Sequence, residues 1–138
     1  MGFLLDTNVV SELRKIERCS RSVRNWFEAT PAEELFTSVL VMGEIRRGVE
    51  ICRIRDVATA LVLEKWLHEV EAIYDQRILP VTGEICDIWG GLSINARLPA
   101  VDGLLAATAL HHRLTLVTSN KPDVERSGVD CLNPFVEQ

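Results

Sequence analysis

The sequence has no long hydrophobic run and no excess of positive charge. No apolar stretch approaches the ~18 residues needed to span a bilayer. No basic segment precedes an apolar one at the start, so we expect no signal peptide and a cytoplasmic protein. Lys and Arg number 15 against 20 Asp and Glu, a formal net charge of −5. This charge argues against a protein that holds nucleic acid through a broad basic face, but it is compatible with a nuclease whose acids are concentrated in one site.

Cysteine is scarce, and its spacing argues against a zinc site. The four cysteines, at positions 19, 52, 86 and 131, include no CxxC pair, and the three histidines show no zinc-ligand spacing near them. We expect these cysteines to be small core residues or bystanders. The pattern GxGxxG is also absent after every predicted strand, which argues against a dinucleotide site.

The sequence does contain alternating strand-like and helix-like segments. Apolar residues make up 47% and charged residues 25%, which is typical of a globular protein, and the length suits one domain over residues 1–138. Strands are predicted at 3–5, 35–38, 77–81, 114–118 and 129–132, and helices at 42–52, 56–76, 82–92 and 100–112. Such alternation predicts an α/β fold with a central parallel sheet flanked by helices on both faces.

Acidic residues follow or interrupt apolar runs at four places. These are Asp6 after FLL, Glu44 early in the helix after the second strand, Asp102 just after a proline, and Asp123 after LTLVT. Ligands of open parallel sheets bind beyond the carboxyl ends of the strands, so we expect these carboxylates to converge there. Two like charges ~4 Å apart repel by about 4 kcal/mol at an effective dielectric near 20, which favours a bound cation. Oxygen ligands without Cys or His indicate Mg²⁺ or Mn²⁺ and phosphodiester chemistry.

Each acid also has an ordinary structural explanation. Asp6 can open a turn, Asp102 can favour a helix N-terminus, and Asp123 can cap a turn. Glu44 can pair with Arg47 three residues on, although its helical neighbours direct it toward the apolar side, with space beside it.

Three segments together resemble the PIN domain family. They are LLDTNVVSEL at the start, EIRRG in the middle and VDGLLAATALHHRLTLVTSN near the end, and the resemblance extends in order over the whole sequence. The similarity is greatest to VapC-type toxins, including the FitB-like members. It implies a single PIN-like α/β/α domain. It also implies an Mg²⁺-dependent endoribonuclease, with Mn²⁺ able to substitute, that acts as the toxin of a toxin–antitoxin pair.

The resemblance also implies roles for individual residues. Asp6, Glu44 and Asp102 are the implied catalytic acids and metal ligands, and Glu44 either binds metal or positions the attacking water. Asp123 is the implied fourth catalytic acid, with Asn120 as the alternative fourth ligand. The implied supporting residues are Thr118, Asn120, Thr7 and Asn8, and the candidate phosphate contacts are Arg14, Lys15, Arg46 and Arg47.

The partners implied by the resemblance are an antitoxin and RNA. We expect a VapB-like antitoxin, an RNA substrate, and DNA contact only through the antitoxin. We also expect a homodimer or a heteromeric assembly with the antitoxin, and no membrane association. The predicted helix 56–76 offers Trp66 and Tyr74 as apolar surface for such contacts, although the same stripe also suits a core.

Two other functions remain open on the sequence. One is a non-catalytic PIN-like module that partners a DNA-binding antitoxin in a transcription-regulating complex. The presence of Asp6, Glu44 and Asp102 argues against it. The other is a phosphohydrolase of the haloacid-dehalogenase kind, which needs a second acid two residues after the first. Asn8 stands at that position and argues against it.

Overall fold

Short strands alternate with longer helices along the chain. The structure is a computed structural model that describes residues 1–137, apart from the side chains at positions 93 and 95. Its elements are, in order, β1 (Phe3–Leu5), α1 (Thr7–Leu13), α2 (Arg21–Ala29), η1 (Ala32–Glu34), β2 (Leu35–Ser38), α3 (Val39–Arg55), α4 (Val57–Tyr74), η2 (Asp75–Arg77), β3 (Ile78–Leu79), α5 (Gly83–Asn95), α6 (Ala100–His112), β4 (Thr115–Val117), α7 (Lys121–Glu125) and β5 (Cys131–Leu132).

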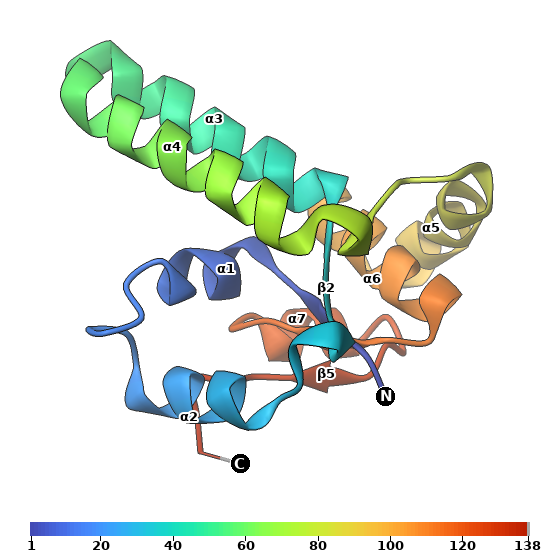
Figure 1. The fold of residues 1–138 in the computed structure, drawn as a ribbon. Coiled ribbons are helices and arrows are strands. Elements are labelled where there is room, and N and C mark those ends of the chain that lie inside the picture. Colours follow the sequence, from blue (N-terminus) through green and yellow to red (C-terminus); the bar gives the residue numbers. More distant parts are fainter. Residues whose placement is uncertain (138) are drawn as a thin grey trace.

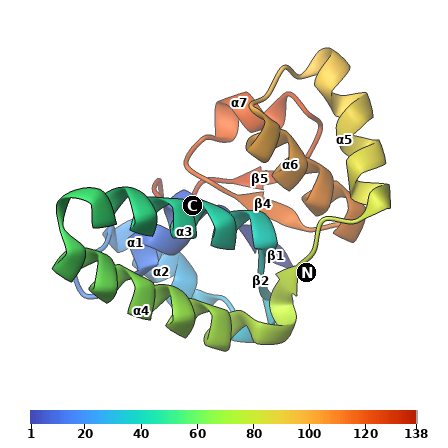
Figure 2. The ribbon, with the colours of Figure 1, turned by 90° about the horizontal axis from the view of Figure 1, so that it is seen from above.

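A parallel sheet lies at the centre of the molecule. Within residues 1–137 it has five strands in the order β3-β2-β1-β4-β5, and every neighbouring pair is parallel. Figures 1 and 2 show α1 and α2 on one side of the sheet and α5 and α6 on the other. The predicted α/β fold with helices on both faces is therefore confirmed. Because β1 is central, its carboxyl end lies between those of β2 and β4.

The core is made of aliphatic side chains from the sheet and its helices. Leu4 and Leu5 of β1, Leu116 of β4 and Leu105 of α6 are at most 1% exposed. The alanines of α6 are small enough to let this helix lie close against its neighbours, which burial favours. No described helix combines the length and the apolar character needed to cross a membrane.

Polar side chains set several helix boundaries. Asp56 caps α4 by accepting a 3.0 Å hydrogen bond from the Thr59 N–H. Ser38 and Thr82 cap α3 and α5 in the same way, through their hydroxyl oxygens. The Ser38 cap explains why α3 begins three residues before the predicted start. Arg113 ends α6 in the left-handed conformation, at φ 57°.

Some sequence predictions differ from the structure. The strand predicted at 77–81 is only Ile78–Leu79, since a 3₁₀ turn precedes it and Pro80 has no N–H to donate. Tyr74, offered above as surface for a partner, is 7% exposed and belongs to the core. Of the two expectations for the cysteines, the structure agrees with bystanders, because none belongs to the buried core: Cys86 is exposed and the other three are half-buried.

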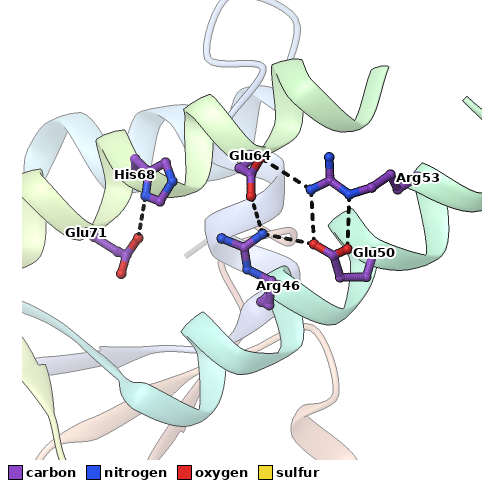
Figure 3. A network of polar contacts seen from close by, with 6 residues as sticks. All are labelled: Arg46, Glu50, Arg53, Glu64, His68 and Glu71. Atoms are coloured by element: carbon purple, nitrogen blue, oxygen red, sulfur yellow. Dashed lines mark hydrogen bonds and ion pairs between the residues drawn. The ribbon is translucent and has the colours of Figure 1, made fainter. Parts of the chain in front are cut away.

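Helices α3 and α4 pack side by side as a hairpin near the carboxyl end of β2 (Figure 1). Figure 3 shows the charged network between them. Arg53 donates two 3.0 Å hydrogen bonds to Glu50 and lies 3.3 Å from Glu64, and Arg46 donates to both carboxylates. Hydrogen bonds from Arg53 and then Arg46 lower the pKa of Glu50 to about 2. Each exposed pair contributes little alone, but the network ties the two helices together.

We predict that Leu116→Ala lowers the free energy of unfolding by about 2–5 kcal/mol, because it leaves a cavity in the middle of the core. The matched control is Leu61→Ala on α4, where the side chain is 55% exposed and the expected change is below about 0.5 kcal/mol. Urea unfolding followed by circular dichroism measures both. Similar losses in the two variants would contradict the placement of Leu116.

Candidate active site

A cleft of about 490 Å³ opens at the carboxyl ends of β1 and β4. Its walls carry Asp6, Thr7, Asn8, Glu44, Asp102, Ser119 and Asn120. These residues come from four parts of the chain: the segments after β1 and β4, the helix α3, and the first turn of α6. The sheet topology therefore places three of the four predicted acids, Asp6, Glu44 and Asp102, on one cleft.

Asp6 is the most buried acid of the cleft, at 7% exposed. Its backbone N–H donates to the Val117 carbonyl at 3.0 Å, which joins the end of β1 to β4. Its Oδ1 accepts a 2.7 Å hydrogen bond from the Thr7 N–H, and its Oδ2 accepts a 2.8 Å bond from the Thr118 hydroxyl. Burial raises the pKa of Asp6 above its ordinary value. The bonds from Thr118 and Thr7 oppose this rise in pKa, and the charge of Glu44 adds to it.

The loop after β4 is fastened to Asp6 and α1 by two side chains. The Thr118 hydroxyl donates to Asp6 and accepts a 3.0 Å hydrogen bond from the Asn120 N–H. Asn8 Oδ1 accepts a 3.3 Å bond from the Ser119 N–H. The residues predicted to support the site thus form a connected set around the Asp6 carboxylate.

Glu44 reaches the cleft from α3 and is exposed. Its Oε1 accepts a 2.5 Å hydrogen bond from the Thr7 hydroxyl, and among the described side chains no ion pair joins it to Arg47. The space expected beside it exists, since a Cβ added at Gly48 meets no atom within 4 Å. Glu44 also borders two depressions with apolar walls, one with Leu63 and Trp66 and one with Val39 and Leu40, so its surroundings are apolar as expected although the side chain itself is exposed.

Asp102 enters the cleft from the first turn of α6 and is half-buried. Burial is the largest cause that raises the pKa of Asp102. The charges of Asp6, Glu44 and Asp123 raise that pKa further. Asp102 is therefore repelled by the other three carboxylates, and Asp6 is also repelled by Glu44.

The glycine after Asp102 sets how closely α6 packs on α5. A Cβ at Gly103 would lie 2.9 Å from Cδ1 and Nε1 of the Trp89 indole, closer than atoms normally approach. Glycine is thus required for this helix contact, which in turn sets the position of Asp102. Sequence reasoning missed this contact. A glycine directly after a site acid, within a helical segment, was the signal that pointed to it.

Asp123 and Asn120 occupy different positions relative to the cleft. Asn120 lies in its wall, whereas Asp123 is exposed in the first turn of α7, 3.3 Å from Arg126. The charge of Asp123 reaches Asp102, as the raised pKa of Asp102 records. The choice between the two as fourth ligand stays a prediction.

Two of the predicted phosphate contacts are paired with carboxylates. Arg46 belongs to the α3–α4 network with Glu50 and Glu64, and Lys15 lies 3.6 Å from Glu12. These cations are therefore partly neutralised within the protein itself.

The other two predicted phosphate contacts, Arg47 and Arg14, lie beside the cleft. Arg47 lines a groove of about 550 Å³ that also includes Glu44. The guanidinium carbon of Arg14 lies 5.8 Å from the centre of the Trp66 ring. A phosphate that reached Glu44 would pass near both arginines.

The donor atoms of the cleft suit a hard cation in kind, since they are carboxylate, amide and hydroxyl oxygens. Within the described residues, however, no group of three or more His, Cys, Asp or Glu side chains is arranged to hold a metal ion. Both oxygens of Asp6 and one of Glu44 accept hydrogen bonds from the protein. The ligand roles of these acids stay predictions.

Comparisons with known proteins agree on one family. Residues 3–126 match the PIN domain family. VapC ribonuclease Y4jK of Sinorhizobium fredii is 30% identical over 137 residues, which is 96% of each protein. Toxin FitB of Neisseria gonorrhoeae is 28% identical over 137 residues, covering 96% of this chain and 97% of that protein. A solved structure of FitAB bound to a DNA fragment is similar with a TM-score of 0.88 and 26% identity, covering 99% of this chain and 97% of that one.

We predict that Thr118→Val raises the pKa of Asp6 further. The change removes a hydroxyl hydrogen bond that stabilises the ionised carboxylate. A carboxyl group whose pKa is raised by folding costs stability when it ionises. The variant should therefore lose more stability than the wild type as the pH rises through the Asp6 pKa. Carboxyl-carbon NMR titration measures the pKa, and thermal unfolding across pH measures the stability.

The control for this change is Thr37→Val. Thr37 is also buried, but its hydroxyl donates to the Leu5 carbonyl at 3.3 Å and to no carboxylate. This variant should leave the Asp6 pKa unchanged. An unaltered Asp6 pKa in Thr118→Val would show that the hydroxyl does not hold the carboxylate.

Proposed function

The chain belongs to the PIN domain family, and we propose that it is a metal-dependent endoribonuclease that acts as the toxin of a toxin–antitoxin pair. The observation that carries the proposal is the single cleft lined by Asp6, Glu44 and Asp102. The similarity to a VapC ribonuclease and to toxin FitB, over nearly the whole chain, supports the reaction and the role. We place the activity in the cytoplasm, where its RNA substrate would be found.

Asp6, Asp102 and Glu44 would hold the cation, which is Mg²⁺ in this proposal, with Mn²⁺ able to substitute. Asn120 or Asp123 would complete the site. When bound, such an ion makes water a better nucleophile and stabilises charge on a phosphate. The oxygen-only donors support this choice, and so does the repulsion that raises the pKa of Asp102, because a cation would relieve it. The side chains would have to reorient to coordinate the ion.

The proposed reaction is hydrolysis of an RNA phosphodiester. A water oxygen bonds to phosphorus, and the bond from phosphorus to one ribose oxygen breaks. The ribose oxygen leaves with the bonding electron pair and takes up a proton from solvent water. The Thr118 hydroxyl keeps Asp6 in one orientation, and the Thr7 hydroxyl does the same for Glu44. Glu44 would position the attacking water and accept its proton, and Arg47 beside it would contact the substrate phosphate.

We propose a VapB-like antitoxin as the partner, with DNA bound only through it. The similarity to toxin FitB and to FitAB bound to DNA supports this partner. The net charge of −5 supports an indirect contact with DNA. The outer end of the α3–α4 hairpin carries apolar side chains that suit a homodimer or a heteromeric interface. They are Ile51, Ile54, Val57, Leu61 and Val62, each 48–84% exposed.

One observation favours a second candidate function, a PIN-like module that binds its partner without cutting RNA. The acids of the described residues are not arranged to hold a metal ion. If they never become so arranged, the fold would serve only as a stable partner of a DNA-binding protein. Cleavage and metal binding, tested separately below, distinguish the two functions.

We predict that the purified chain cleaves labelled total cellular RNA with Mg²⁺ or Mn²⁺ and not with chelator. Asp6→Asn and Asp102→Asn should each reduce the rate by about a hundredfold or more, because each removes a charge that the site needs. Gel electrophoresis of the RNA over time measures the rate.

The matched control for cleavage is Asp87→Asn, which removes an exposed acid of α5 outside the cleft and should leave the rate unchanged. Absence of cleavage by folded, antitoxin-free protein would reject the nuclease. Equal loss in the Asp87 variant would mean that total charge, and not the cleft, is what matters.

We predict that Mg²⁺ raises the thermal midpoint of the wild type but not that of Asp102→Asn. With chelator at pH 7, Asp102→Asn should instead unfold at a higher temperature than the wild type. The pKa of Asp102 is raised by folding, so its ionisation costs stability. This difference should disappear as the pH falls below the ordinary aspartate pKa, where both proteins are uncharged at this position.

Scanning fluorimetry measures these midpoints without any reliance on activity. Asp87→Asn again serves as the control and should respond to Mg²⁺ as the wild type does. An equal Mg²⁺ response in Asp102→Asn would exclude Asp102 as a ligand.

A further inference from the structure

A second pocket lies next to the carboxylate cleft. It has a volume of about 350 Å³ and is enclosed by α1, α3 and α4, with Arg14, Gly48, Leu63 and Trp66 in its wall. Figure 1 shows α1 lying beneath the α3–α4 hairpin, where these elements meet. This volume falls within the range of small-molecule sites, ~300–1,000 Å³.

Two planar groups, the Arg14 guanidinium and the Trp66 indole, lie close together in the wall of this pocket. Trp66 is half-buried, and the guanidinium of Arg14 is positioned over its ring at 5.8 Å from the centroid. Aromatic rings and guanidinium planes are the groups on which unpaired nucleobases stack. Leu63 adds apolar wall, and Ser11 adds a hydroxyl that can bond to a base edge. The pocket therefore has the chemistry to hold a flat, partly polar ring.

The pocket adjoins the cleft. Thr7 and Glu44 line both depressions, and the Thr7 hydroxyl donates to Glu44. An RNA strand with one phosphate beside Glu44 would thus have an adjoining base within reach of Trp66. The wall is also held in place, because the network of Arg46, Arg53 and their carboxylates ties α3 to α4 (Figure 3).

The negative charge of the chain favours a mode of RNA binding that needs no added positive charge. The net charge is −5, and Arg46 and Lys15 are paired with carboxylates of the protein itself. These ion pairs reduce the positive charge that is available to hold RNA by its phosphates. A base stacked on an aromatic ring gains affinity without adding positive charge.

We propose that this pocket binds one unpaired nucleobase of single-stranded RNA, next to the bond that is cut. The base would stack on Trp66 with Arg14 at its edge or opposite face. This inference rests on the proposed ribonuclease function, since it assigns a substrate subsite to that activity. It also makes the substrate single-stranded at that nucleotide.

The first test uses NMR of the three indole N–H signals in the presence of chelator. We expect the four nucleoside 5′-monophosphates to shift the Trp66 signal saturably, and ribose 5-phosphate to leave it unmoved. Trp26, which makes an edge-to-face contact with Phe3, and Trp89, which packs on Gly103, should not respond. An equal shift of the Trp66 signal by ribose 5-phosphate would overturn the proposal, because the site would then bind the sugar phosphate and not the base.

The second test fills the pocket without altering the acids. Gly48→Leu places a side chain at the pocket wall, and a Cβ at this position meets no atom within 4 Å, so the fold should accept it. We expect it to weaken nucleotide binding and raise the KM for RNA cleavage about ten- to a hundredfold, the value of one base stack, with kcat retained. Trp66→Phe, which keeps an aromatic ring, should lose less than Trp66→Leu.

The matched control is Gly91→Leu on α5, an exposed glycine that also has no atom within 4 Å of an added Cβ. It should bind nucleotides and cleave RNA as the wild type does. Unchanged nucleotide binding and KM in Gly48→Leu, with RNA cleavage intact, would overturn the base pocket, leave the ribonuclease standing and assign the pocket to the antitoxin. Base-dependent shifts of Trp66 in a protein that cleaves no RNA would support the pocket and reject the nuclease.

Discussion

The burial of one carboxylate, that of Asp6, is the constraint on which the site depends. It lies where the central strand ends, its N–H is bonded to β4, and its two oxygens are held by Thr7 and Thr118. These bonds partly offset the cost of removing a charge from water, which still raises its pKa. After burial, the charge of Asp6 is the largest cause that raises the pKa of Asp102 on the same cleft, and this repulsion is what the proposed cation would relieve.

The parallel topology brings distant segments to this point. Crossovers return each strand in the same direction, so the segments after β1 and β4 and the helix after β2 open at one edge. The α3–α4 hairpin then extends the edge beyond the sheet and adds the Trp66 pocket. The protein thus combines a polar cleft suited to a phosphate with an aromatic pocket suited to a base, and Thr7 and Glu44 belong to both.

The sequence predicted the fold class, the family and the three acids of the cleft. It could do so because periodicity, strand ends and motif order are local or directly tied to topology. It did not predict the ion pair between Arg46 and Glu64, since Glu64 comes from another helix. The position of Asp123 outside the cleft wall depends on where the short α7 begins, and the burial of Tyr74 depends on how α4 rotates against the core. These are facts of tertiary packing, which no single segment encodes.

The contact between Gly103 and Trp89 has a consequence for how such a chain can evolve. A residue larger than glycine at 103 would collide with the indole unless a smaller ring or an aliphatic side chain replaced it. The two positions are therefore not free to drift separately, and a compensated pair of substitutions is the viable route. Because position 102 carries a cleft acid, the changes permitted at this helix crossing are limited by the need to keep the neighbouring carboxylate in place.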